Sequence, residues 1–85
     1  MKINIDIPEY SASQGLRFEW EDAFNIKVSV VNSTVHILAD EGGFTSLARH
    51  FLTIAQKNVL SGTHFHLDSS NSLEEGSCEL IIEKM

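Results

Sequence analysis

The chain has 85 residues, six basic and twelve acidic side chains, and a formal net charge of −6. This length suits one small domain, which we expect to span residues 1–85. Because phosphate contacts need clustered lysine and arginine, the charge argues against nucleic acid as a partner. A negative charge suits a basic protein partner, and it equally suits a small protein that only has to stay in solution.

No part of the sequence indicates export or membrane insertion. The N-terminus alternates polar and apolar residues, unlike a signal peptide. No apolar run approaches the roughly 20 residues of a spanning helix. The single cysteine, Cys78, cannot form an internal disulfide, which fits the reducing cytosol. With methionine at both ends, we expect a complete, cytoplasmic protein.

Four segments in the first half alternate with the period of a strand, at residues 3–7, 16–20, 24–30 and 34–39. Phe18 and Trp20 in the second segment are expected to fill the core, and Trp20 could instead anchor an interface if this strand lies at the sheet edge. Asn32 and Ser33 predict a two-residue hairpin between the last two, because Asn tolerates a positive φ. This turn pairs Val30 with Val35, so that apolar residues meet on one face.

The apolar period then becomes helical between residues 43 and 60, with Gly42 and Gly43 at the start. His50 lies outside the apolar stripe, and we expect it to be exposed, like His36 on its strand. We expect the stripe to pack against a sheet, and it consists of Phe44, Leu47, Ala48, Phe51, Leu52, Ala55 and Val59.

Two further strands, at residues 63–68 and 77–83, flank a polar loop. The second of them is expected to turn Cys78, Leu80 and Ile82 inward. The sum is an α+β fold, a mainly antiparallel five- or six-stranded sheet with one amphipathic helix packed on one face. Strand 34–39, the helix and strand 63–68 fit a right-handed parallel crossover.

The run Thr63-His64-Phe65-His66-Leu67-Asp68 is the most informative motif. Its alternation turns Phe65 and Leu67 inward and leaves two imidazoles and a carboxylate on the exposed face. Such a face suits metal binding, catalysis or recognition. Further acidic side chains in the last hairpin extend it, so that the candidate partner-binding residues are His64, His66, Asp68, Glu74, Glu75 and Glu79.

Metal binding is the first of the functions that these exposed residues could have. Two imidazoles about 6.7 Å apart can share an ion, whereas Asp68 lies about 13 Å from His64 and is too far away. If the loop joins the strands symmetrically, His66 faces Glu79 and His64 faces Ile81. His64, His66 and Glu79 then form a two-histidine, one-carboxylate set. The competing interpretation is a simple His66–Glu79 cross-strand pair without metal, and we expect no cofactor.

An enzyme is not expected, because an inward Cys78 is a poor nucleophile and no phosphate loop or nucleophile elbow is present. Recognition is the preferred interpretation, since an acidic surface attracts a basic partner. The same charges also suit a solvated loop that prevents edge-to-edge association. Leu38 and Ile81 on the open sheet face offer a contact for a homodimer.

Three runs, at residues 43–52 (GFTSLARHFL), 62–68 (GTHFHLD) and 72–82 (SLEEGSCELII), resemble the immunity protein 32 family of bacterial polymorphic toxin systems. The resemblance spans residues 40–83. It implies a cytoplasmic protein that neutralises a cognate toxin by direct stoichiometric binding. Residues 64, 66, 68, 74, 75 and 79 match polar positions of these motifs, and their expected exposure assigns them to the binding surface.

Overall fold

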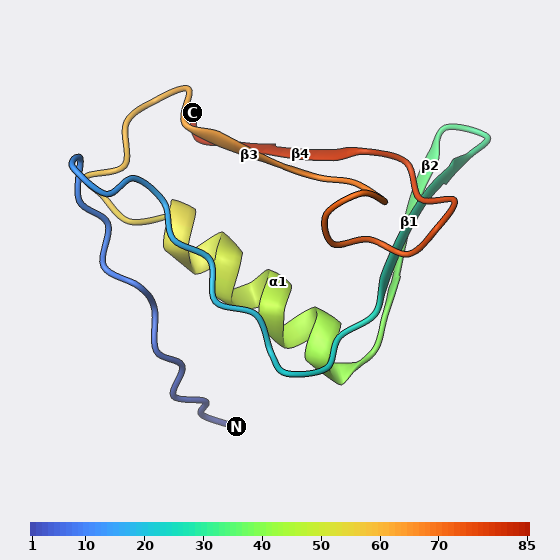
Figure 1. Cartoon of the computed structure of the whole chain (residues 1–85), viewed down its shortest axis with the longest axis horizontal. Helices are drawn as coiled ribbons and strands as arrows, with labels where there is room; N and C mark the ends of the chain where they lie inside the picture. The colour runs from blue at the N-terminus through green and yellow to red at the C-terminus, as the bar shows by residue number, and fades with distance from the viewer.

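A computed structural model describes residues 1–85. The chain forms two separate two-stranded antiparallel sheets, β1–β2 and β3–β4, and one helix. Figure 1 shows β3–β4 on one side of α1, β1–β2 rising from the first turn of α1, and the segment before β1 running along the helix. The elements are β1 (Ile26–Val31), β2 (Thr34–Ala39), α1 (Glu41–Ile54), β3 (His64–Leu67) and β4 (Leu80–Glu83).

The expectation of one five- or six-stranded sheet is therefore wrong, although helix and strands are both present. Residues 3–7 and 16–20 form no strand, and no backbone–backbone hydrogen bond involves them. Side chains from α1 and from the turn that follows it bind this part of the chain instead: Arg49 Nε donates to Asp6 O (3.3 Å) and Gln56 Nε2 to Pro8 O (2.9 Å). Because β2 and β3 belong to different sheets, the predicted parallel crossover is wrong as well.

The chain between β3 and β4 covers the free edge of β1. Glu74 N donates to Ile26 O and Cys78 N to Val28 O, both at 2.8 Å. Residues 77–79 therefore do not extend β4, which begins at Leu80. Cys78 is exposed, and the expectation that it points inward is wrong.

The β1–β2 hairpin matches its prediction. Asn32 and Ser33 have φ angles of 50° and 64°, as a two-residue turn of this kind requires. Val30 pairs with Val35, and Val28 with Ile37. Ile26 and Val28 are almost completely buried, so the base of this hairpin belongs to the core.

Helix α1 buries a different face from the one predicted. Leu47 and Ile54 are in the core, but Phe44, Phe51 and Leu52 are 53%, 42% and 48% exposed. The buried face includes three polar residues, Ser46, His50 and Thr53.

Two of these polar residues have hydrogen-bond partners, which explains why they can replace apolar residues in the interior. Ser46 Oγ accepts from Glu21 N (3.0 Å), and Thr53 Oγ1 donates to Arg49 O (2.7 Å). The helix also ends at Ile54, six residues before the expected limit. Val59, in the turn that follows, is in the core as expected.

The first turn of α1 is fixed by Asp40. Its Oδ1 accepts from Gly43 N (2.7 Å) and Asn25 N (3.0 Å), and its Oδ2 accepts from Asn25 Nδ2 (2.7 Å). These hydrogen bonds stabilise the carboxylate and lower the pKa of Asp40, the bond from Asn25 N contributing most. One side chain thus ties the start of β1 to the start of the helix.

The core that results is small. Leu16, Phe18 and Trp20 pack against it from the segment before β1, although that segment is not a strand. No helix in the structure has the length and apolar character needed to cross a membrane. The buried apolar residues are Ile26, Val28, Leu47, Ile54, Val59, Phe65, Leu67 and Leu73.

Candidate recognition surface

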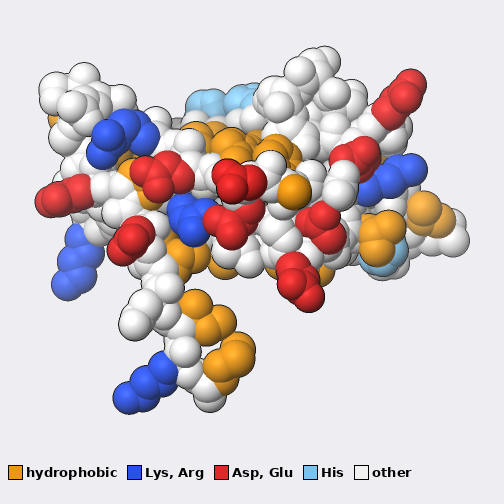
Figure 2. Space-filling view, turned by 60° about the horizontal axis from the view of Figure 1, so that its bottom comes forward, with side chains coloured by type: hydrophobic (Ala, Val, Ile, Leu, Met, Phe, Trp, Pro, Cys, Tyr) orange, Lys and Arg blue, Asp and Glu red, His pale blue; other side chains and the backbone are white.

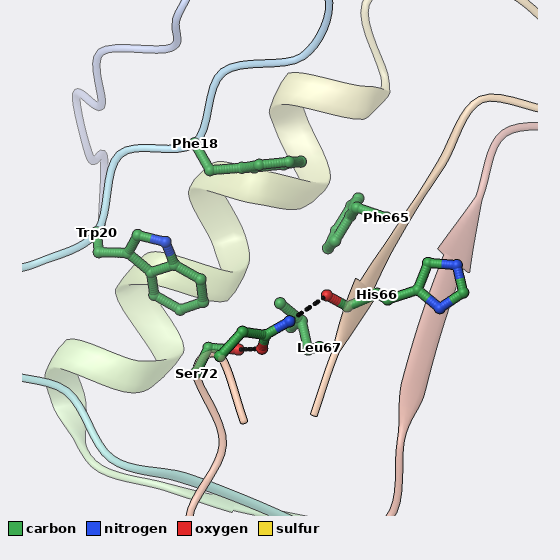
Figure 3. A pocket seen from close by; sticks show the side chains of 7 residues that line it. Phe18, Trp20, Phe65, His66, Leu67 and Ser72 are labelled. Atoms are coloured by element: carbon green, nitrogen blue, oxygen red, sulfur yellow. Dashed lines mark hydrogen bonds between the residues drawn. The ribbon is translucent and has the colours of Figure 1, made fainter. Parts of the chain in front are cut away.

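The alternation predicted for β3 is confirmed. Phe65 and Leu67 are 7% and 5% exposed and belong to the core, whereas His64 and His66 are exposed. Figure 3 shows Phe65 pointing from β3 toward α1 and His66 pointing to the opposite side. The two imidazole rings are neighbours, with centroids 5.1 Å apart.

Both histidines lie beside carboxylates of the last strand region. His66 Nδ1 is 3.3 Å from Glu79 Oε2, and His64 Nδ1 is 3.9 Å from Glu83 Oε1 and 2.9 Å from Gly62 O. Glu83 was not among the predicted partner-binding residues. The observed register pairs His64 with Glu83 and His66 with Ile81, so the predicted register is wrong by two residues. The His66–Glu79 contact nevertheless forms, as a diagonal pair.

The three-ligand metal set is not assembled. His64, His66 and Glu79 do not converge, because the Nδ1 atoms of the two histidines face different oxygens. The structure contains no group of three or more His, Cys, Asp or Glu side chains that could hold a metal ion.

The acidic residues differ in their roles. Asp68 is half-buried, and its carboxylate accepts from Ser70 N (2.8 Å) while its carbonyl accepts from three following amides. Its first role is therefore to shape the loop. Glu74, Glu75 and Glu79 are exposed, and of the three only Glu79 has a side-chain partner, His66. Acidic side chains also spread across the face in Figure 2, where the N-terminal segment projects from the body, so the last hairpin is not the only acidic region.

A pocket of about 200 Å³ opens beside His66, between the segment before β1 and strand β3 (Figure 3). It exists because residues 16–20 lie on α1 without pairing to β3, an arrangement with no signal in the sequence. Asn71 Nδ2 donates to His66 O (3.1 Å) at its edge. The pocket is smaller than the roughly 300–1,000 Å³ of small-molecule sites and has the size for one side chain. It is lined by Phe18, Trp20, Phe65, His66, Leu67, Asn71 and Ser72.

His50 lies behind this aromatic wall. Its ring centroid is 4.3 Å from that of Trp20 and 4.9 Å from that of Phe18, and neither ring nitrogen has a hydrogen-bond partner. The expectation that His50 is exposed is wrong, because the segment before β1 covers this side of α1. Burial, and to a lesser degree the charge of Arg49, lower the pKa of His50 to about 4. The imidazole is therefore neutral at pH 7 and packs like an aromatic core residue.

Fold and surface together define a small α+β protein with an exposed histidine and carboxylate surface beside an aromatic pocket. The sequence model of the immunity protein 32 family matches residues 34–85, more than half of the chain. The chain belongs to this family, which confirms the resemblance seen in its sequence. Membership indicates an immunity function, a non-catalytic role and a toxin as the partner. No curated protein and no solved structure matches the chain.

Proposed function

We infer that the protein neutralises the cognate toxin of a bacterial polymorphic toxin system by direct, stoichiometric binding in the cytoplasm. The observation that most strongly supports this proposal is the family match over residues 34–85. That range contains every residue of the recognition surface, which we define as His64, His66, Asp68, Glu74, Glu75 and Glu79.

The charge of this surface supports a basic toxin face as its target. Glu74 and Glu75 are exposed, and no lysine or arginine pairs with them. In a chain of net charge −6, exposed and unneutralised carboxylates accelerate the encounter with a basic partner. The His66–Glu79 pair stands at the border between these charges and the pocket.

The pocket supports a defined apolar contact beside the recognition surface. Interfaces draw most of their binding energy from a few large side chains that enter well-packed pockets. Phe18, Trp20 and Phe65 provide apolar walls, and the volume fits one such side chain of the toxin. Trp20 is the only tryptophan in the chain, so its fluorescence reports directly on occupation of the pocket.

The homodimer suggested by the sequence lacks its structural basis. Leu38 and Ile81 are 61% and 49% exposed, but they lie on β2 and β4, in different sheets. They do not share the single open sheet face on which that contact depended.

The test is co-expression with the toxin encoded beside the protein's gene. We expect growth with the wild type and loss of growth with Glu74→Lys/Glu75→Lys/Glu79→Lys, since the surface then repels a basic partner. The matched control, Glu9→Lys/Glu19→Lys/Asp22→Lys, makes the same charge change at exposed positions elsewhere and should preserve growth. Failure of the wild type to protect would contradict the function, and equal protection by both triple variants would contradict the surface.

A further inference from the structure

Helix α1 has a second apolar face that nothing in the chain covers. Phe44, Phe51 and Leu52 are 53%, 42% and 48% exposed, and Ala48 and Ala55 beside them are exposed too. At 3.6 residues per turn these five residues fall within an arc of about 100°, separate from the buried face with Leu47 and Ile54. We call these five residues the outer helix face. Glu41, exposed at the first position of α1, is the one charged side chain that falls within the same arc.

The exposed surface of the chain is larger than that of a typical compact monomer of its size. It measures 6076 Å², roughly 1,000 Å² more than the about 5,000 Å² that a monomer of this mass presents. The radius of gyration is 13.5 Å, against about 12 Å for a compact domain of this length. A standard protein interface removes about 800 Å² from each partner. Part of this excess lies in the projecting N-terminal segment (Figure 2), where Met1 and Ile3 are 110% and 70% exposed, and the exposed apolar side chains of α1 contribute another part.

Among the exposed apolar residues, those of the outer helix face are the best candidates for the centre of a protein interface. Only eight apolar residues form the core, whereas twelve large apolar residues are exposed. On the β1–β2 hairpin the exposed residues are divided between its two faces, Val30 and Val35 on one, Val31 and Leu38 on the other. The exposed apolar residues of α1, in contrast, all lie on one face of the helix.

We propose that the protein forms a homodimer in which the outer helix faces of two copies pack antiparallel across a two-fold axis. Phe44, Ala48 and Leu52 follow each other at intervals of four and form the ridge that commonly packs between helices. With the axis at Ala48, Phe44 of each copy meets the partner's Leu52, and the two Ala48 residues meet each other. The small alanine lets the helices approach, and the face is complementary to itself, as a two-fold interface requires.

A second copy fits this face better than the toxin does. The recognition surface carries the carboxylates expected to meet a basic protein, whereas the outer helix face is apolar and has only Glu41 at its N-terminal end. Phe65 and Leu67 pack toward α1 and His64 and His66 point away from it, so the dimer leaves both recognition surfaces open. The dimer is therefore independent of the proposed toxin contact.

Sedimentation equilibrium of the full chain tests this inference. The wild type should pass from 9.5 kDa to twice that mass as its concentration rises from about 1 µM to 1 mM. Phe51→Ser/Leu52→Ser should weaken dimerisation at least about tenfold, with the circular dichroism spectrum of the wild type, because both residues are exposed. Leu38→Ser/Ile81→Ser removes similarly exposed apolar residues elsewhere and should leave the dimerisation unchanged. A wild type that stays monomeric throughout, or a control that weakens the dimer as much, would overturn the proposal.

Cross-linking tests the axis itself. In a Cys78→Ser background, which removes the only native thiol, Ala48→Cys should give a disulfide-linked dimer on mild oxidation, since residue 48 faces its own copy. Ala23→Cys, also exposed, is the matched control and should stay monomeric. Equal cross-linking at both positions would indicate random collision and would overturn the placement.

Discussion

The indole ring of Trp20 lies edge-on against the imidazole ring of His50, with centroids 4.3 Å apart and planes at 73°. Trp20 comes from the segment before β1 and His50 from α1, so this contact joins two elements 30 positions apart in the sequence, behind the wall of the aromatic pocket. Because the imidazole has no hydrogen-bond partner, it is held there by packing alone. A proton on His50 would place a charge inside this packing, which makes the contact sensitive to pH.

Stability should fall as the pH decreases from about 7 toward 4. The unfolded chain protonates His50 near pH 6.5, whereas the folded chain does so only near pH 4. The unfolded state therefore binds more protons within this window, and acid favours it. We expect a loss of about 2 kcal/mol in the free energy of unfolding between pH 8 and pH 5, measured by urea denaturation.

Replacement of the imidazole separates this effect from other titrations. His50→Leu should remove most of the slope between pH 7 and pH 5, since no proton is then bound on unfolding. His36→Gln removes an exposed histidine and should leave the slope intact. An unchanged slope in His50→Leu would show that other groups cause the acid sensitivity.

Asp40 should affect the stability of the fold at a lower pH than His50 does. Its hydrogen bonds lower its pKa in the folded state, so its contribution is present above the unfolded pKa of about 3.9 and is lost as the pH falls below it. At pH 7, Asp40→Ala should lower the melting temperature by about 5 °C. Asp40→Asn should lower it less, because an asparagine oxygen can still cap Gly43. Asp22→Ala, an exposed control, should have no measurable effect.

Gly42 should not tolerate a side chain. A Cβ atom at this position would collide with the backbone carbonyl of Ala23, which cannot move without displacing the segment that enters β1. Helix propensity alone favours alanine by about 1 kcal/mol. We expect the collision to prevail, so that Gly42→Ala destabilises the protein by about 1–3 kcal/mol in urea denaturation. A stabilised variant would show that residues 23–25 do not approach the helix so closely.

Ser33 should be better replaced by glycine. Its φ of 64° is unfavourable for a residue with a side chain, and an Asn-Gly turn suits this hairpin best. Ser33→Gly should raise the free energy of unfolding by up to about 1 kcal/mol. Ser61→Gly, at an exposed position where φ is negative, should lower stability slightly, because glycine there only adds freedom to the unfolded chain. The opposite order would contradict the turn conformation.

Features determined by neighbouring residues were predictable from the sequence. The alternation in β3 placed Phe65 inward and His66 outward, and the Asn32–Ser33 turn fixed the register of β1–β2. Features that depend on distant partners were not. Ser46 can be buried only because Glu21 N donates to it from a segment 25 residues away, and no periodicity reveals such a bond.

The candidate site likewise combines features that neighbouring residues predict with features that depend on distant partners. The exposure of His64 and His66 followed from local alternation, but the register of β3–β4 depended on the loop between them. Because Glu74 and Cys78 pair with β1, that loop is asymmetric and brings Glu83, not Ile81, opposite His64. The pocket beside His66 likewise depends on where Phe18 and Trp20 pack against α1.

Calorimetric titration of the purified protein with the toxin encoded beside its gene tests the central claim most directly. The account predicts a complex with one toxin per chain, affinity reduced at least about tenfold in Glu74→Lys/Glu75→Lys/Glu79→Lys, and no reduction in Glu9→Lys/Glu19→Lys/Asp22→Lys. Absence of a complex with the wild type would contradict toxin neutralisation by binding. Equal affinity of the two triple variants would contradict the recognition surface.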